Sequence, residues 1–141
     1  MVQIIKTYGM EKEVVFHRAF DCVNDPYRAI EQLIELGINR ILTSGLETKA
    51  TEGAELIRRL QEKYGDKIEI LAGSGINSKN ARELMEYTGI TQIHSSCKKW
   101  LRDETPSKNH VSYTYGSDSY GYEAVDYNLV KELAEIVHKS C

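Results

Sequence analysis

One group of residues in this chain combines the side-chain types that acid–base and anion chemistry require. His17, Arg18 and Asp21 lie within five positions, directly after a short apolar segment. An imidazole can carry a proton or bind a metal, a guanidinium can clamp an anion, and a carboxylate can pair with either. These three residues are the candidate catalytic residues. The alternative is a structural role, in which an Arg18–Asp21 ion pair holds a loop and His17 is a satisfied polar group.

A second group consists of serines and glycines that follow three further apolar segments. Glycine lets backbone N–H groups approach a ligand, and the N-terminus of a helix, here beginning at Asn77 or Ser78, favours an anion. With Arg18, the residues predicted to bind an anion are Ser44, Gly45, Gly73, Ser74, Gly75, Ser95 and Ser96. The alternative is that the glycines only make tight turns and the serines only cap helices.

A third candidate site contains soft metal ligands. His94 and Cys97 are the one close His/Cys pair, and Cys22 lies on another loop. Copper(I) prefers sulfur ligands, and imidazole suits several transition metals. His94 and Cys97 are therefore the candidate metal ligands, although a free cysteine is often simply buried.

The elements that position these residues are four short apolar strands, each ending in polar residues. They are predicted at 14–17, 40–43, 68–72 and 92–94. Right-handed crossovers make such strands parallel and ordered as in the sequence, with the helices on one side. The pattern is typical of the (βα) units of a TIM-type barrel, so the predicted fold class is α/β, and the polar tips share one edge.

Helix ends are visible between the strands. Asp25-Pro26 predicts an N-cap followed by proline in the first turn, and Gly37 predicts the stop of that helix. Thr48 or Thr51 is expected to cap the next helix, which would then contain Gly53. A last helix is predicted over 127–138, and the polar, aromatic residues 106–126 before it are predicted to form an irregular loop.

Four strands are too few to close a barrel, which needs about 200 residues or more. Residues 2–8, followed by Gly9, have the pattern of the end of a helix. We therefore expect residues 1–141 to form a single domain that is the C-terminal half of a barrel. With both sheet edges unpaired, the chain is expected to form a homo-oligomer or to need a missing N-terminal half.

Composition excludes several classes of protein. A net charge of −3 gives no electrostatic footprint for nucleic acid, and no apolar run is long enough for a membrane span. The N-terminus lacks the features of a secretory signal, so the cytoplasm is the expected compartment. Three cysteines, Cys22, Cys97 and Cys141, are odd in number and suit a reducing compartment.

Four motifs in this order resemble those of the CutC family of copper homeostasis proteins, over most of the chain. They are 15–21, 40–45, 72–77 and 93–96. The resemblance implies a cytoplasmic TIM-type barrel, of which this chain matches the second half, and it implies copper as a cofactor. The cysteines that the family is usually said to use for copper lie in the first half.

The resemblance implies a role in copper homeostasis, with copper or a small anionic ligand bound at the C-terminal mouth of the barrel. One alternative is a barrel enzyme, or a binder, that acts on a small phosphorylated metabolite. Another is a truncated, inactive fragment. The sequence assigns no reaction.

Overall fold

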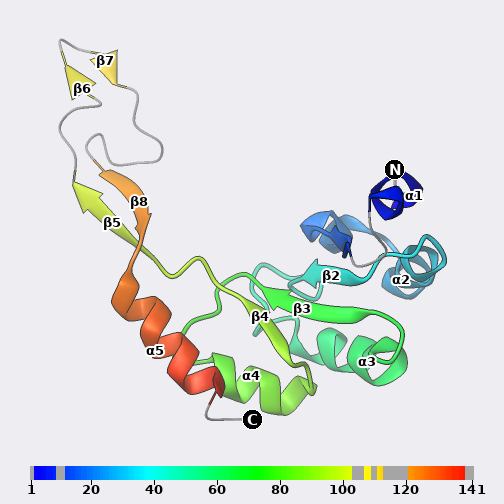
Figure 1. Ribbon diagram of the computed structural model, residues 1–141. Coiled ribbons are helices and arrows are strands. Elements are labelled where there is room, and N and C mark those ends of the chain that lie inside the picture. The colour runs from blue at the N-terminus through cyan, green and yellow to red at the C-terminus, as the bar shows by residue number, and fades with distance from the viewer. Residues whose placement is uncertain (1, 9–11, 103–106, 109–110, 113–120, 139–141) are drawn as a thin grey trace. The chain divides into compact units, whose positions relative to one another are not determined.

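The computed structural model describes residues 2–8, 12–102, 107–108, 111–112 and 121–138 (Figure 1). The chain divides into two compact units, residues 1–95 and residues 96–141. Each unit is described by itself.

The first unit is built on a parallel sheet of four strands. These are β1 (Val15–Phe16), β2 (Arg40–Thr43), β3 (Glu69–Gly73) and β4 (Gln92–His94), arranged in the order β1-β2-β3-β4. The prediction of parallel strands in chain order is therefore confirmed. Strand β1 is shorter than predicted because His17 caps the helical turn that follows it.

Five helical segments accompany these strands. They are α1 (Val2–Thr7), the 3-10 turn η1 (Arg18–Cys22), α2 (Pro26–Glu35), α3 (Ala54–Tyr64) and α4 (Ala81–Thr88). The start of α2 is as predicted, since the Asp25 carboxylate accepts the N–H groups of Tyr27 and Arg28 at 3.0 and 3.1 Å. The glycine predicted to stop this helix, Gly37, has a φ of 76°. The helix of residues 2–8 ends at Thr7, and Gly9 lies outside the described residues.

The predicted starts of α3 and α4 are wrong. Helix α3 has Gly53 as its N-cap and no side-chain cap, so neither Thr48 nor Thr51 caps it. Helix α4 has Asn80 as its N-cap, later than Asn77 or Ser78. The reason is a separate turn, in which Asn77 Oδ1 accepts the Lys79 N–H and Asn80 Oδ1 accepts the Asn77 N–H.

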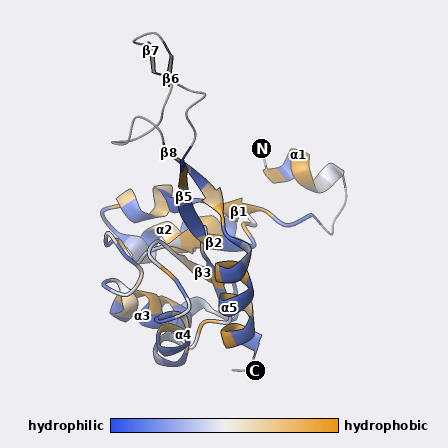
Figure 2. Ribbon diagram, turned by 90° about the vertical axis from the view of Figure 1, so that its left-hand side faces the viewer, coloured by the Kyte–Doolittle hydropathy of each residue, from blue (hydrophilic) through white to orange (hydrophobic). Residues whose placement is uncertain are grey.

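Helices α2, α3 and α4 all cover the same face of the sheet, and none of these three lies on the opposite face (Figure 1). Figure 1 shows α2, α3 and α4 along one side of the strands, and Figure 2 shows that these helices carry both apolar and polar residues. Ile41, Thr43, Ile70 and Ala72 are buried, whereas the alternate residues Leu42 and Leu71 are only half-buried. The core therefore lies between the sheet and the helices.

The second unit consists of two antiparallel pairs and a helix. Strand β5 (Lys98–Arg102) pairs with β8 (Gly121–Val125), and β6 (Ser107–Lys108) pairs with β7 (Val111–Ser112). Helix α5 (Tyr127–His138) lies where the sequence predicts it, with the Asp126 carboxylate accepting the Asn128 N–H at 2.8 Å.

Three of these strands correct the prediction of an irregular loop over residues 106–126, as far as the structure describes that segment. Strand β8 is stabilised by pairing with β5, with partner residues 19 to 27 positions apart in the sequence. Such a non-local partner leaves no local period in the sequence. No helix among the described residues is long and apolar enough to cross a membrane.

Candidate functional site

The carboxyl ends of β1, β2 and β3 meet at one edge of the sheet, because the strands are parallel. Strand β1 leads into η1, β2 leads into Ser44 and Gly45, and β3 leads into Ser74 and Gly75. The residues singled out from the sequence therefore gather at the edge where α/β proteins bind their ligands.

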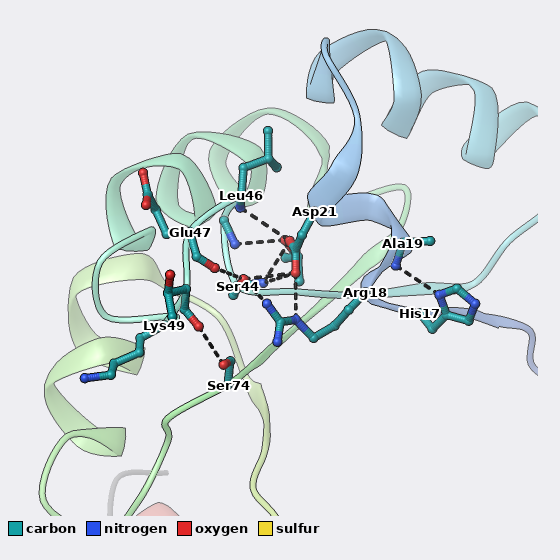
Figure 3. Close-up of polar contacts among 12 residues, drawn as sticks. His17, Arg18, Ala19, Asp21, Ser44, Leu46, Glu47, Lys49 and Ser74 are labelled. Carbon is teal, nitrogen blue, oxygen red and sulfur yellow. Dashed lines mark hydrogen bonds and ion pairs between the residues drawn. The ribbon is translucent and has the colours of Figure 1, made fainter.

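Asp21 is at the centre of the hydrogen bonds at this edge (Figure 3). Its side chain is 7% exposed. Its carboxylate accepts the Thr43 hydroxyl at 2.5 Å, the Ser44 N–H at 3.0 and 3.1 Å, and the Leu46 N–H at 3.3 Å. A carboxylate on η1 therefore holds the first residues of the loop after β2.

Arg18 contacts the same carboxylate. Its Nε donates to Asp21 Oδ2 at 2.7 Å, and its Nη2 donates to Ser44 Oγ at 2.7 Å. The Arg18–Asp21 ion pair, which the sequence left as the alternative to a catalytic role, is present. The Arg18 side chain is 43% exposed, and its Nη1 makes no hydrogen bond to any described residue. Arg18 is thus fixed on one side and has donors left on the other.

The environment of Asp21 favours its charged form. Burial raises the pKa of its carboxyl, but the hydrogen bonds from Thr43, Arg18 and Ser44 outweigh burial and lower the pKa below 3.8. Asp21 is therefore a carboxylate at neutral pH, and its negative charge is matched by Arg18.

Ser44 lies between these groups. Its Oγ is 2.9 Å from Asp21 Oδ2 and 2.5 Å from the Glu47 carbonyl oxygen. A hydroxyl has one proton, so it donates to one of these oxygens at a time while it accepts from Arg18.

The loops at this edge are connected in sequence order by serine hydroxyls. Ser44, after β2, contacts Asp21 of η1. Ser74, after β3, donates its hydroxyl to the Thr48 carbonyl oxygen of the loop after β2, at 2.7 Å. Ser95, after β4, donates its hydroxyl to the Ile76 carbonyl oxygen of the loop after β3, at 2.7 Å. The hydroxyl protons of these serines are therefore donated to acceptors within the protein. Ser44, Ser74 and Ser95 therefore join neighbouring loops, and donors for a ligand must come from Arg18 and the backbone.

The glycines at this edge have steric roles that the sequence left open. A Cβ on Gly73 would lie 2.7 Å from Leu42 Cδ1, and one on Gly45 would lie 2.3 Å from the Gly53 carbonyl oxygen. Gly75 has a φ of 72° and is exposed. No described residue accepts a hydrogen bond from its N–H group. Gly75 is therefore the glycine whose backbone is available to a ligand.

His17 is directed away from Arg18 and Asp21, as the alternation of side chains at a strand end predicts (Figure 3). Its Nδ1 accepts the Ala19 N–H at 3.0 Å, which makes it the N-cap of η1. Its ring is stacked on Phe16 with the centroids 5.5 Å apart. The structure therefore does not bring His17 together with the other two candidate catalytic residues.

The candidate metal ligands lie in different units. His94 is exposed at the end of β4, in the first unit. Cys97 belongs to the second unit and is half-buried. Ser96, one of the residues predicted to bind an anion, also belongs to the second unit and is exposed. Within the described ranges, no group of three or more His, Cys, Asp or Glu side chains is placed to hold a metal ion. These residues alone do not fit a resident copper ion. Cys22 is exposed, and Cys141 lies outside the described residues.

Two residues of this edge were not identified from the sequence. Thr43 donates to Asp21, and Leu46 has a φ of 64°, a conformation that non-glycine residues rarely adopt. Ser74, with a φ of 87°, is also in this region. The position of Thr43 beside Ser44 at a strand end could have indicated its role, whereas no sequence signal marks Leu46. Strained residues of this kind concentrate at functional sites.

The fold and this edge define a class: a parallel α/β protein whose polar residues gather at the carboxyl ends of its strands. The CutC family model matches residues 2–99. The chain belongs to the CutC family.

Three relatives illustrate the match. The chain is 40% identical over 127 residues to a family protein CutC of Treponema denticola, covering 89% of this chain and 51% of that protein. It is 45% identical over 129 residues to one of Pasteurella multocida, covering 89% and 52%. It is 37% identical over 127 residues to the human protein named copper homeostasis protein cutC homolog, covering 87% and 46%. The chain thus spans about half the length of these relatives.

A solved structure agrees with these matches. The putative copper homeostasis protein CutC from Streptococcus agalactiae matches with a TM-score of 0.56 and 31% identity. The match covers 66% of this chain and 48% of that one. The parallel α/β arrangement of the first unit is therefore that of a CutC protein.

Proposed function

We propose that this protein forms half of a TIM-type barrel, acts in copper homeostasis, and binds a small anionic ligand at the carboxyl edge of its sheet. Membership of the CutC family and the names of the relatives support the first two parts. The proposed anion binding rests on the guanidinium of Arg18. Asp21 and Ser44 hold this group in place through Nε and Nη2, and the N–H groups of Nη1 donate to no described residue.

The chemistry of these donors favours a phosphate or a carboxylate. A guanidinium presents N–H groups in a planar fork that matches two oxygens of such an anion. Because Asp21 and Ser44 already hold this fork, little side-chain freedom is lost when a ligand binds. Gly75 is exposed at the same edge, and its N–H, which no described residue accepts, is a second donor. Ser74, the residue before it, has a φ of 87°.

A small phosphorylated metabolite is the ligand class that these donors suit best. The same donors would serve a binding protein or an enzyme. His17 caps η1 and is directed away, so proton transfer by His17 at this ligand has no geometric support. We therefore propose binding, and we assign no reaction to the site.

Copper handling by this chain would need further ligands. His94 and Cys97 remain the candidate metal ligands, and neither belongs to a three-residue ligand group among the described side chains. A metal ion bound by His94 and Cys97 would need further ligands from outside the described side chains. Anion binding through Arg18 does not depend on them.

Thermal unfolding in inorganic phosphate tests the proposed anion site. A ligand at about 100 times its dissociation constant adds roughly 2.7 kcal/mol to the free energy of unfolding. For a chain of this size that corresponds to a rise in Tm of several degrees. Arg18→Ala should lose most of the rise. Arg82→Ala, on the exposed side of α4, should keep it.

Sodium chloride at equal ionic strength controls for screening. An equal rise in Tm with chloride, or the same phosphate effect in both arginine variants, would show that Arg18 does not bind the anion. A lower Tm of Arg18→Ala without phosphate would not show this, because the substitution also removes the ion pair with Asp21.

A further inference from the structure

The outer strands of the sheet each have one edge without a partner strand. Among the described residues, β1 pairs with β2 alone and β4 pairs with β3 alone. An unpaired edge exposes backbone N–H and C=O groups that can add another strand. Because all four strands are parallel, the β4 edge of one chain has the polarity needed to pair with the β1 edge of another.

The face of the sheet opposite the helices carries apolar side chains on β1, β2 and β3. Val15 is 46% exposed although it is a strand residue. By the alternation along each strand, Leu42 and Leu71 belong to the same face, and both are half-buried. This face, which we call the open face, therefore carries apolar side chains on three of its strands.

The charges of the open face are already paired with one another. Arg40 Nε donates to Glu69 Oε2 at 2.6 Å, and Arg40 Nη2 contacts Glu13 Oε2 at 3.1 Å. Gln92 Nε2 also donates to Glu69 Oε2, at 2.9 Å. An ion that enters an interior without a partner is strongly destabilising. Covering the open face would leave Arg40 and Glu69 with the partners that they already have.

We infer that two copies of this chain assemble into one eight-stranded parallel barrel, in which β4 of each copy pairs with β1 of the other. Eight is the number of strands at which a parallel barrel closes around side chains alone. Two copies of a four-stranded sheet supply that number, and the two identical junctions make the assembly a closed dimer. The match to a solved CutC structure takes in 66% of this chain and 48% of that one, about half of its length. The inference rests on the proposed half-barrel and not on the anion site.

Sedimentation velocity of the whole chain tests the assembly. Over about 1 to 100 µM, the chain should sediment with twice its mass of 16.1 kDa, and its Tm should rise with concentration. A folded monomer at all these concentrations would overturn the inference. The inference would also be overturned if the chain stayed monomeric alone and formed a complex only with the separately expressed first half of the Treponema denticola relative. In that case the other chain, and not a second copy, would pair with the open sheet edges.

A matched pair of variants locates the contact. In Val15→Lys, the new ammonium would be buried in the barrel, so the dissociation constant of the dimer should rise about tenfold or more. Leu36→Lys, at a residue of 62% exposure that follows α2, should leave that constant unchanged. Equal dissociation constants for both variants would show that the open face is not the contact.

Hydrogen exchange of the unaltered chain gives a reading that depends on no variant. Peptides containing β1 and β4 should gain protection between 1 and 100 µM by more than those containing β2 and β3, which already have partners on both sides. Protection of β1 and β4 that does not change with concentration would contradict the barrel dimer. Phosphate-dependent stability could still be present in that case, so the two proposals fail separately.

Discussion

Asp21 and Ser44 are 23 positions apart in the sequence, and the Ser44 N–H donates to both oxygens of the Asp21 carboxylate, at 3.0 and 3.1 Å. The first residue lies in η1 and the second follows β2. This contact makes the turn after β1 and the loop after β2 one structural unit. Arg18 contacts both residues, so the proposed ligand donor is held by the same contact.

Asp21→Asn should lower the free energy of unfolding by about 2 kcal/mol, the range for a hydrogen bond to a charged group. An asparagine would place an NH₂ group against at least one of the donors that face the carboxylate, Arg18 Nε or the Ser44 N–H. Urea denaturation measures the loss. Asp66→Asn, at an exposed position, is the control and should change stability by less than about 0.5 kcal/mol.

The contribution of Asp21 should depend on pH. Its pKa is lower in the folded chain than the ordinary value of 3.8, so its stabilisation is complete above that value and is lost as the pH falls through the folded pKa. Glu69 and Asp126 also have lowered pKa values and add to acid unfolding. The difference between the wild type and Asp21→Asn isolates Asp21. That difference should shrink below pH 3.8, and one that stays constant to low pH would contradict this account.

Gly53→Ala should destabilise the chain by more than Gly89→Ala. A Cβ at Gly53 would lie 2.1 Å from the Ser44 carbonyl oxygen, so the backbone would have to move. Gly89 has a φ of 73°, and a Cβ there would lie 3.9 Å from Gln61 Cγ, an ordinary contact, so alanine adds mainly backbone strain of about 1–2 kcal/mol. Thermal unfolding of both variants compares the two costs. Similar losses would mean that the loop after β2 accommodates the methyl group by shifting.

His17→Ala should cost about 1 kcal/mol of stability through the loss of the cap on the Ala19 N–H. Asn is a good capping residue, so His17→Asn should recover most of that stability. Phosphate should raise the Tm of both variants as it does for the wild type. If His17→Ala removed the phosphate effect while keeping the fold, His17 would belong to the ligand site.

The strands were predictable because each is a short apolar run that ends in polar residues. The start of α2 was predictable from Asp25-Pro26, whose capping geometry is local. The start of α4 was not, because the side chains of Asn77 and Asn80 make a turn that competes with the first turn of a helix. Strands β5 and β8 were missed since each is stabilised by a distant partner, and charged residues such as Lys98 and Lys99 obscure the pattern.

The candidate site was predictable in its location and only partly in its contacts. The Arg18–Asp21 pair is local, and the spacing of three residues offered it as the alternative to a catalytic role. The use of the Ser44, Ser74 and Ser95 hydroxyls between loops was not expected, because each depends on which loop lies beside it. Residue types at strand ends therefore indicate where a candidate site lies, while the fold determines which of its polar groups bond within the protein.

The central claim is that Arg18 and the Gly75 N–H bind an anion at the carboxyl edge of the sheet. A titration of the ¹⁵N-labelled chain with inorganic phosphate, followed by NMR at constant ionic strength, tests this claim most directly. The account predicts saturable shifts of the Arg18 side-chain and Gly75 backbone N–H signals, with the same dissociation constant, and their absence in Arg18→Ala. Shifts that do not saturate, or that leave both signals unmoved while the chain stays folded, would contradict it.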